Sequence, residues 1–206
     1  MTHKFFKEII QKLPSSFETG PWVAGGFPLS VYRADKVFSH DIDFFFKDEQ
    51  QFDLYVSLFE KNFLKKDGKE IKDDIINPYS EFFLFNDRFT KIVTDNAVTF
   101  TPCNVGEDKV VIQFIKKKFY VDIEAVFDDF DISVCKIATD GVEFLASDRT
   151  YEHIDNSIFE LDLIHEKSIK RFTKYVQYGF APTEKTIRGI FEYKNFITDF
   201  TGVDDY

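Results

Sequence analysis

Two aspartates, Asp41 and Asp43, alternate with apolar residues in the segment HDIDFFF of residues 40–46. Successive side chains of a β-strand point to opposite faces, so we expect both carboxylates on one face and Ile42 and Phe44 on the other. Carboxylates buried among apolar residues need a compensating partner, and a divalent cation is the expected one. Strand geometry would separate the two Cα atoms by roughly 6.6 Å, which suits two Mg²⁺ ions about 3.5–4 Å apart. The pattern therefore predicts a two-magnesium site, with Mn²⁺ as an alternative metal.

A glycine pair, Gly25 and Gly26, ends the short apolar run PWVA upstream of these aspartates. Glycine permits a sharp turn that brings backbone N–H groups close to an anion, and a following helix adds its positive N-terminal end. The pair thus predicts a phosphate-binding turn. We expect Ser30 and Arg33, on that helix, to add a hydroxyl and a positive charge to it; the alternative is that both face solvent.

The order of these features, which is an apolar strand, a glycine pair, a helix and an Asp-hydrophobic-Asp strand, resembles the signature of the nucleotidyltransferase superfamily. That superfamily includes DNA polymerase beta, poly(A) polymerase and the tRNA CCA-adding enzymes. The resemblance spans residues 22 to about 145, and the C-terminal helices are similar to the closing segment of nucleotidyltransferase-like proteins of bacteriophages and large viruses. It implies a third carboxylate on a later strand, and Asp131, in the segment DISVCKIATDG, matches that place. Asp41, Asp43 and Asp131 would then be both the catalytic and the metal-binding residues.

The resemblance implies transfer of NMP from an NTP, such as ATP, to a hydroxyl of an unknown acceptor, with release of pyrophosphate. RNA, protein and small molecules are the candidate acceptors. Lys170 and Lys174, which share a basic helical stripe with Lys167 and Arg171, are expected to hold the triphosphate or a nucleic-acid acceptor. A solvated helix face is the alternative for this stripe.

Four other functions remain open at this point. The first is a binding protein on the same fold that holds a nucleotide or a partner without turnover. The second is a toxin-like tRNA-modifying nucleotidyltransferase, which Ser39, two positions before Asp41, favours in part. A nuclease or phosphatase could use the same carboxylates on a substrate without NTP. In a purely structural protein, the aspartates would be paired with buried Lys or Arg.

The surrounding pattern predicts an α+β fold: a nucleotidyltransferase-like mixed sheet flanked by helices, with a helical C-terminal segment. We expect a catalytic core over residues 1–150 and helices packed on it over residues 151–206. Apolar residues at helical spacing predict helices in EQQFDLYVSLFEKNF, DIEAVFDDF, HEKSIKRFTKYVQYG and TEKTIRGIFEYKNFITDF, and a first helix near residues 5–13. Strands are expected in PWVA, HDIDFFF, EFFLF, AVTFT, KVVIQFIKKKF and DISVCKIATDG.

The charge and the apolar content of the chain argue against some classes of binding partner. A net charge of −10 over 206 residues argues against a surface that grips long duplex nucleic acid, which needs a basic footprint. No stretch approaches the roughly 20 apolar residues that span a bilayer, so we expect no membrane association and a cytoplasmic location, the host cytoplasm for a viral protein. The two cysteines favour reduced thiols over a disulfide framework.

Overall fold

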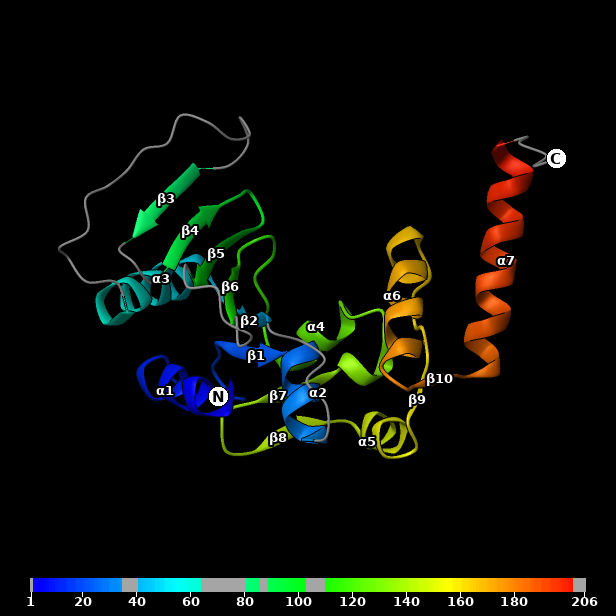
Figure 1. The fold of residues 1–206 in the computed structure, drawn as a ribbon, viewed down its shortest axis with the longest axis horizontal. Coiled ribbons are helices and arrows are strands. Elements are labelled where there is room, and N and C mark those ends of the chain that lie inside the picture. Colours follow the sequence, from blue (N-terminus) through cyan, green and yellow to red (C-terminus); the bar gives the residue numbers. More distant parts are fainter. Residues whose placement is uncertain (1, 35–40, 64–80, 86–88, 103–109, 202–206) are drawn as a thin grey trace. The chain divides into compact units, whose positions relative to one another are not determined.

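The computed structural model describes residues 2–34, 41–63, 81–85, 89–102 and 110–201. It confirms the α+β class and divides the chain into two compact units (Figure 1). Unit 1 consists of residues 1–126 and 138–145, and unit 2 of residues 127–137 and 146–206. The catalytic core over residues 1–150 stays a prediction, and unit 2 takes in residues 127–137 and 146–150 of that range. The earlier excursion over residues 127–137 was not predicted, because no turn or linker signal marks it.

Unit 1 is built on a mixed sheet of eight strands among the described residues. The order across the sheet is β3 (Glu81–Phe85), β4 (Phe89–Val93), β5 (Ala97–Pro102), β6 (Val111–Ile115), β2 (Asp41–Phe45), β1 (Trp22–Ala24), β7 (Ile137–Thr139) and β8 (Phe144–Ala146). The central pair β2–β6 is parallel, whereas β1 runs antiparallel to β2. The strand that carries the two aspartates therefore lies in the interior of the sheet.

One face of this sheet is closed by an aromatic core from the helices α1 (Thr2–Lys12) and α3 (Glu49–Phe63), both formed as predicted. Phe59 of α3 stacks on Phe100 of β5 with ring centroids 4.2 Å apart and meets Phe114 of β6 edge-on. Phe44 of β2 is fully buried in the same core. Each such ring contributes on the order of 1.5–3 kcal/mol by burial, so this face fixes which side chains of β2 point inward.

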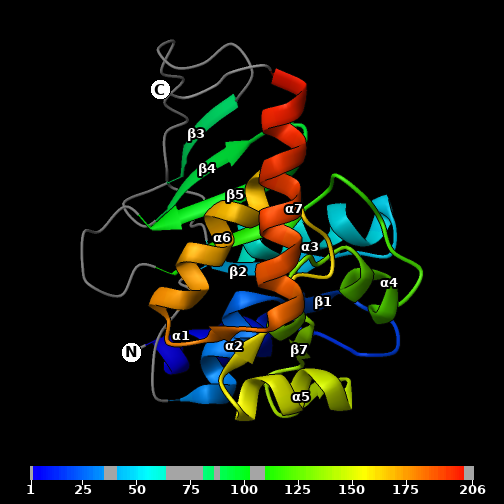
Figure 2. The ribbon, with the colours of Figure 1, turned by 90° about the vertical axis from the view of Figure 1, so that its right-hand side faces the viewer.

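Unit 2 is mainly helical and contains α5 (Asp148–Asp155), α6 (Glu166–Gln177), α7 (Glu184–Thr201) and a short pair of parallel strands, β9 (Ile158–Phe159) and β10 (Ala181–Pro182). Figure 2 shows α5 beside β9 at the base of this unit. The helices α6 and α7 confirm the expected helical C-terminal segment. His165 caps α6 through Ser168, whose backbone N–H donates to the His165 Nδ1 while the Ser168 hydroxyl accepts the His165 N–H.

The strand expected over DISVCKIATDG is wrong for its first half. Residues Ser133–Cys135 form a 3-10 helix, and only Ile137–Thr139 form a strand, β7. Two local hydrogen bonds hold the turn, from the Cys135 N–H to the Ile132 carbonyl and from the Lys136 N–H to the Ser133 carbonyl. Ile132 meets Leu161 in an isolated antiparallel bridge. Partners distant in sequence thus override the local alternation that predicted a longer strand.

Candidate active site

A turn at Gly25 and Gly26 connects β1 to α2 (Gly26–Arg33). Gly25 precedes the helix with φ 98° and ψ −141°, a conformation that only glycine adopts without strain. Its carbonyl accepts a helical hydrogen bond from the Leu29 N–H at 3.3 Å, so the helix begins directly at the turn. The first backbone N–H groups of a helix have no partner within it, and their dipoles favour an anion at this end. The strand, the glycine turn and the helix are therefore formed in the predicted order, and phosphate binding at the turn stays a prediction.

Asp41 and Asp43 lie on the face of β2 that is turned away from the aromatic core. Asp41 is exposed and Asp43 half-buried, whereas Ile42 and Phe44 have no accessible surface. The β1–β2 register pairs Val23 with Phe44, and its continuation by one residue places Ala24 opposite Asp43. Because the two strands are antiparallel, the end of β1 that leads into the glycine turn lies beside the start of β2 that carries the carboxylates. The structure therefore places Gly25, Gly26, Asp41 and Asp43 at the same end of the adjacent strands β1 and β2. We call this end of the two strands the β2 edge, although β2 itself is an interior strand of the sheet.

The neighbouring strand β6 adds a polar residue that we did not single out in the sequence. Gln113 is the register partner of Asp43 in the parallel β2–β6 pair, and Val111 is that of Asp41. Register partners in a sheet project from the same face, so the Gln113 amide lies on the carboxylate side. The available signal was a single amide among the apolar residues of KVVIQFI, which does not by itself indicate a neighbour on another strand.

Ser30 and Arg33 lie on α2, as predicted. The Ser30 hydroxyl donates a hydrogen bond to the Gly26 carbonyl at 3.0 Å and is buried at 6% exposure, so it braces the first turn of its own helix. Arg33 is half-buried in the last turn, at the opposite end of the helix from the glycine turn. Direct contacts of these two side chains with a phosphate stay a prediction.

Asp131 belongs to unit 2 and lies just before the 3-10 helix rather than on a sheet strand. Both oxygens of its buried carboxylate accept hydrogen bonds. Oδ1 accepts one from the Arg171 guanidinium at 2.5 Å, and Oδ2 accepts one from the Ser168 hydroxyl at 2.8 Å. The His165 Nε2 lies 3.6 Å from Oδ2. These contacts anchor α6 to the segment that precedes η1 (Ser133–Cys135). The role of Asp131 as a third metal ligand stays a prediction.

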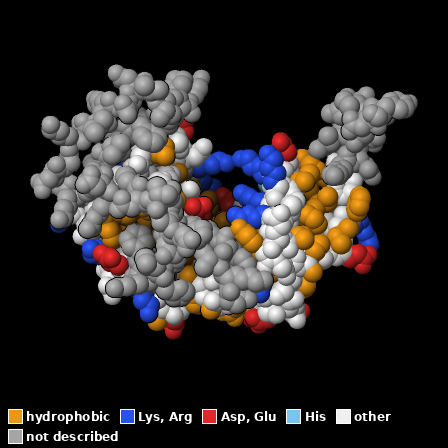
Figure 3. Space-filling view, in the orientation of Figure 1, with side chains coloured by type: hydrophobic (Ala, Val, Ile, Leu, Met, Phe, Trp, Pro, Cys, Tyr) orange, Lys and Arg blue, Asp and Glu red, His pale blue; other side chains and the backbone are white. Residues whose placement is uncertain are grey.

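The basic side chains of α6 lie in two different environments, one beside a buried carboxylate and one in solvent. Arg171 turns to Asp131, while Lys170 and Lys174 are exposed, and the Lys174 ammonium lies 5.6 Å from the centre of the Tyr178 ring. Figure 3 shows Lys and Arg side chains gathered along α6. The contact of Lys170 and Lys174 with a triphosphate remains a prediction.

The donor chemistry of the β2 edge suits magnesium, because carboxylate and amide oxygens are the hard ligands that this ion prefers. Within the part of the chain that the structure describes, no three His, Cys, Asp or Glu side chains converge on a point that could hold a metal ion. Binding of a cation by Asp41 and Asp43 stays a prediction.

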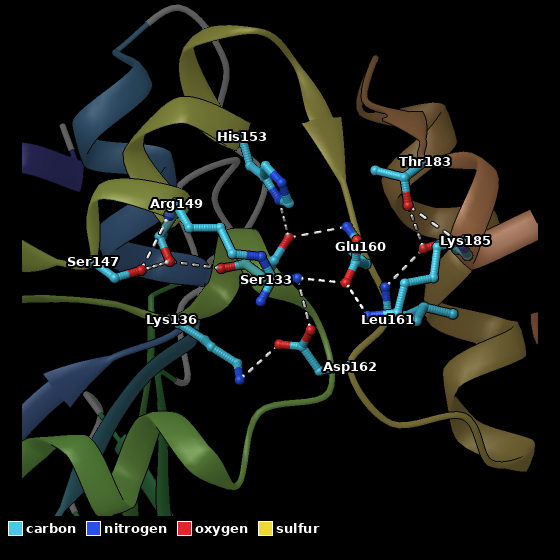
Figure 4. Close-up of polar contacts among 12 residues, drawn as sticks. Ser133, Lys136, Ser147, Arg149, His153, Glu160, Leu161, Asp162, Thr183 and Lys185 are labelled. Carbon is cyan, nitrogen blue, oxygen red and sulfur yellow. Dashed lines mark hydrogen bonds and ion pairs between the residues drawn. The ribbon is translucent and has the colours of Figure 1, made fainter.

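Unit 2 also contains a polar network centred on Ser133 (Figure 4). The Ser133 Oγ accepts the Glu160 N–H at 3.0 Å and lies 2.7 Å from the His153 Nδ1. Since that oxygen already accepts one hydrogen bond, its own hydrogen is available to the imidazole nitrogen. Burial and the charge of Arg149 lower the pKa of His153, which keeps the ring neutral and able to accept.

Ion pairs surround this network. Arg149 Nη2 lies 2.6 Å from Glu160 Oε1 and 2.8 Å from Asp162 Oδ1, and Lys136 Nζ lies 2.7 Å from Asp162 Oδ2. Burial alone would raise the pKa of Asp162, but hydrogen bonds and charges from Arg149 and Lys136 outweigh it and lower that pKa. These ion pairs connect η1, α5 and the segment after β9, so we expect them to stabilise the fold of unit 2.

Cys135 and Tyr175 form a second buried contact, with Sγ and Oη 2.6 Å apart. Burial raises the pKa of the Cys135 thiol to about 11 and raises that of Tyr175 well above its ordinary value. Both groups are therefore neutral near pH 7. Cys135 is a free thiol, and its burial makes it a poor nucleophile. Cys103 lies outside the described residues.

The fold and its β2 edge define an α+β protein with a mixed sheet, in which a glycine turn and two aspartates meet at one end of adjacent strands. The chain belongs to the family described as Gad2: Gabija anti-defense 2 family protein, whose family model matches residues 1–157. The matched region contains the whole eight-stranded sheet and α5. A search of curated proteins finds no match to this chain. In the described residues, no helix has the length and apolar character to cross a bilayer.

Proposed function

We propose that this chain is a metal-dependent nucleotidyltransferase that moves NMP from an NTP to a hydroxyl acceptor. The observation that carries the proposal is the placement of Asp41 and Asp43 beside the Gly25–Gly26 turn. Each element is common alone, but a phosphate-binding turn next to paired carboxylates on one sheet edge suits a magnesium-bound triphosphate.

In the proposed reaction, the backbone N–H groups after Gly25 hold the triphosphate, and Asp41 and Asp43 hold the cations. Magnesium, when bound, supplies positive charge that stabilises the transition state and the departing pyrophosphate. The acceptor oxygen forms a bond to the α-phosphorus while the bond from that phosphorus to the β-bridging oxygen breaks. The acceptor proton passes to a carboxylate beside the attacked phosphorus.

The family description supports a biological setting for this activity. We propose that the transfer serves to counter Gabija defence in the cytoplasm of a host cell, with RNA, protein or a small molecule as acceptor. The acidic chain, at −10, favours a compact anionic ligand that arrives with its own metal over a long duplex.

The test uses the full chain with each α-labelled NTP, Mg²⁺, and extract of cells that carry Gabija. We expect label to enter one macromolecular or small-molecule fraction, with release of pyrophosphate. Asp41→Asn and Asp43→Asn should abolish transfer, while Asp53→Asn, an exposed carboxylate on α3, should leave it unchanged. Wild-type protein that incorporates no label with any NTP would refute the catalytic proposal.

One observation favours a second candidate, a binding protein on the same fold. Asp131, the predicted third carboxylate, accepts hydrogen bonds from Arg171 and Ser168. Two of the three predicted carboxylates, Asp41 and Asp43, then remain as the expected metal ligands. A binder would show Mg²⁺-dependent stabilisation by NTP that is lost in Asp43→Asn, without pyrophosphate release. The same labelled-NTP assay therefore separates the two candidates.

A further inference from the structure

The two central parallel strands of unit 1 place an amide beside the paired carboxylates. Gln113 of β6 is in register with Asp43 of β2, and on its other side it is in register with Thr99 of β5. The three residues form a row across the sheet, and all three are half-buried. Neighbouring strands lie about 4.8 Å apart, so a glutamine side chain can bring its carbonyl oxygen to a cation held by the adjacent aspartate.

The flanking residues of β6 fix the direction in which Gln113 projects. Ile112 and Phe114 have no accessible surface and belong to the aromatic core on the opposite face. A one-residue slip of β6 would drive the amide into that core and expose two large apolar side chains. The register is therefore strongly specified, and the Gln113 amide is held on the carboxylate face.

Asp131 is placed less well for the same task. Both of its oxygens are engaged within unit 2, by Arg171 and Ser168, and its side chain is 4% exposed. Its use as a ligand would require release from Arg171 and would leave a packed helix without its anchor. The Gln113 oxygen carries no such cost.

We propose that Gln113, through its side-chain carbonyl, is the third protein oxygen donor for the cation at Asp41 and Asp43, in place of Asp131. This inference rests on the proposed function. A neutral third donor gives the protein ligands a charge of −2 instead of −3, which weakens their hold on a free cation. The triphosphate itself then supplies the missing negative charge, so metal and NTP bind together.

The experiment measures Mn²⁺ binding to the full chain by electron paramagnetic resonance, with and without a non-hydrolysable ATP analogue. Gln113→Glu should tighten Mn²⁺ binding without nucleotide by roughly tenfold or more, because it adds a unit charge beside a divalent ion. Gln113→Leu, which has no donor, should weaken it by roughly tenfold. Gln113→Asn keeps the amide on a side chain that is one methylene shorter, so its carbonyl oxygen should lie farther from the cation and Mn²⁺ binding should also weaken. Gln50→Glu, at an exposed position of α3, is the matched control for added charge and should bind as wild type.

The outcomes separate this inference from the function on which it rests. If Asp43→Asn loses Mn²⁺ while the three Gln113 variants bind as wild type, the inference is wrong and the cation site stands. If Asp41→Asn and Asp43→Asn also bind as wild type, the proposed function fails with it. Loss of Mn²⁺ in a folded Asp131→Asn variant, with no effect of Gln113→Leu, would return the third place to Asp131. Circular dichroism confirms that each variant is folded before its affinity is compared.

Discussion

The ion pair between Asp131 and Arg171 supports a quantitative prediction about unit 2. The Asp131 side chain is 4% exposed and that of Arg171 is 48% exposed. Removal of one partner from a fully buried pair costs about 3–5 kcal/mol, whereas a hydrogen bond to a charged group contributes about 1.5–3 kcal/mol. Since Arg171 is half in water, the lower range applies. We expect Arg171→Met, which keeps much of the side-chain length, to lower the free energy of unfolding by about 2 kcal/mol.

A double-mutant cycle isolates the pair from other effects. Asp131→Asn removes the charge but keeps the shape, and the double variant should be less destabilised than the sum of the single variants by about 1 kcal/mol or more. Urea denaturation followed by helical circular dichroism is the suitable assay, because the single tryptophan, Trp22, lies in unit 1. Arg188→Met is the matched control, since Arg188 pairs with Glu184 at the surface and should cost under about 0.5 kcal/mol. An Arg171→Met variant as stable as this control, with no coupling to Asp131, would refute the anchoring role.

Three further predictions concern the buried polar groups of unit 2. Ser133→Ala should lower the free energy of unfolding by about 2–3 kcal/mol, because it leaves the Glu160 N–H without its acceptor; a loss under about 0.5 kcal/mol in urea would contradict this. The lowered pKa of His153 means that the unfolded chain binds more protons just below its ordinary pKa of 6.5, so stability should fall as the pH falls below about 6.5, and His153→Gln should flatten that slope in urea titrations at several pH values. With its pKa at about 11, the Cys135 thiol should resist iodoacetamide at pH 8 in the native protein and react on unfolding, as mass spectrometry of its peptide would report; rapid native alkylation would show that the contact with Tyr175 opens readily.

The sequence by itself determined the elements whose pattern is local. The helical spacing of apolar residues predicted α1, α3, α6 and α7, and alternation around Asp41 and Asp43 predicted β2 with both carboxylates on one face. The glycine pair predicted the turn before α2. Such features depend on residues only a few positions apart. The regular side-chain period of a helix or a strand is therefore visible in the sequence as a repeat of apolar residues.

Only the tertiary structure decided which of these elements lie side by side. Gln113 stands next to Asp43 because β6 pairs with β2, although the two residues are far apart along the chain. Asp131 finds its partner 40 residues later, at Arg171, and its segment forms a short 3-10 helix where alternation had predicted a strand. No periodicity relates residues at such separations. Their contacts follow from strand order and from the burial of charge, which are properties of the assembled fold.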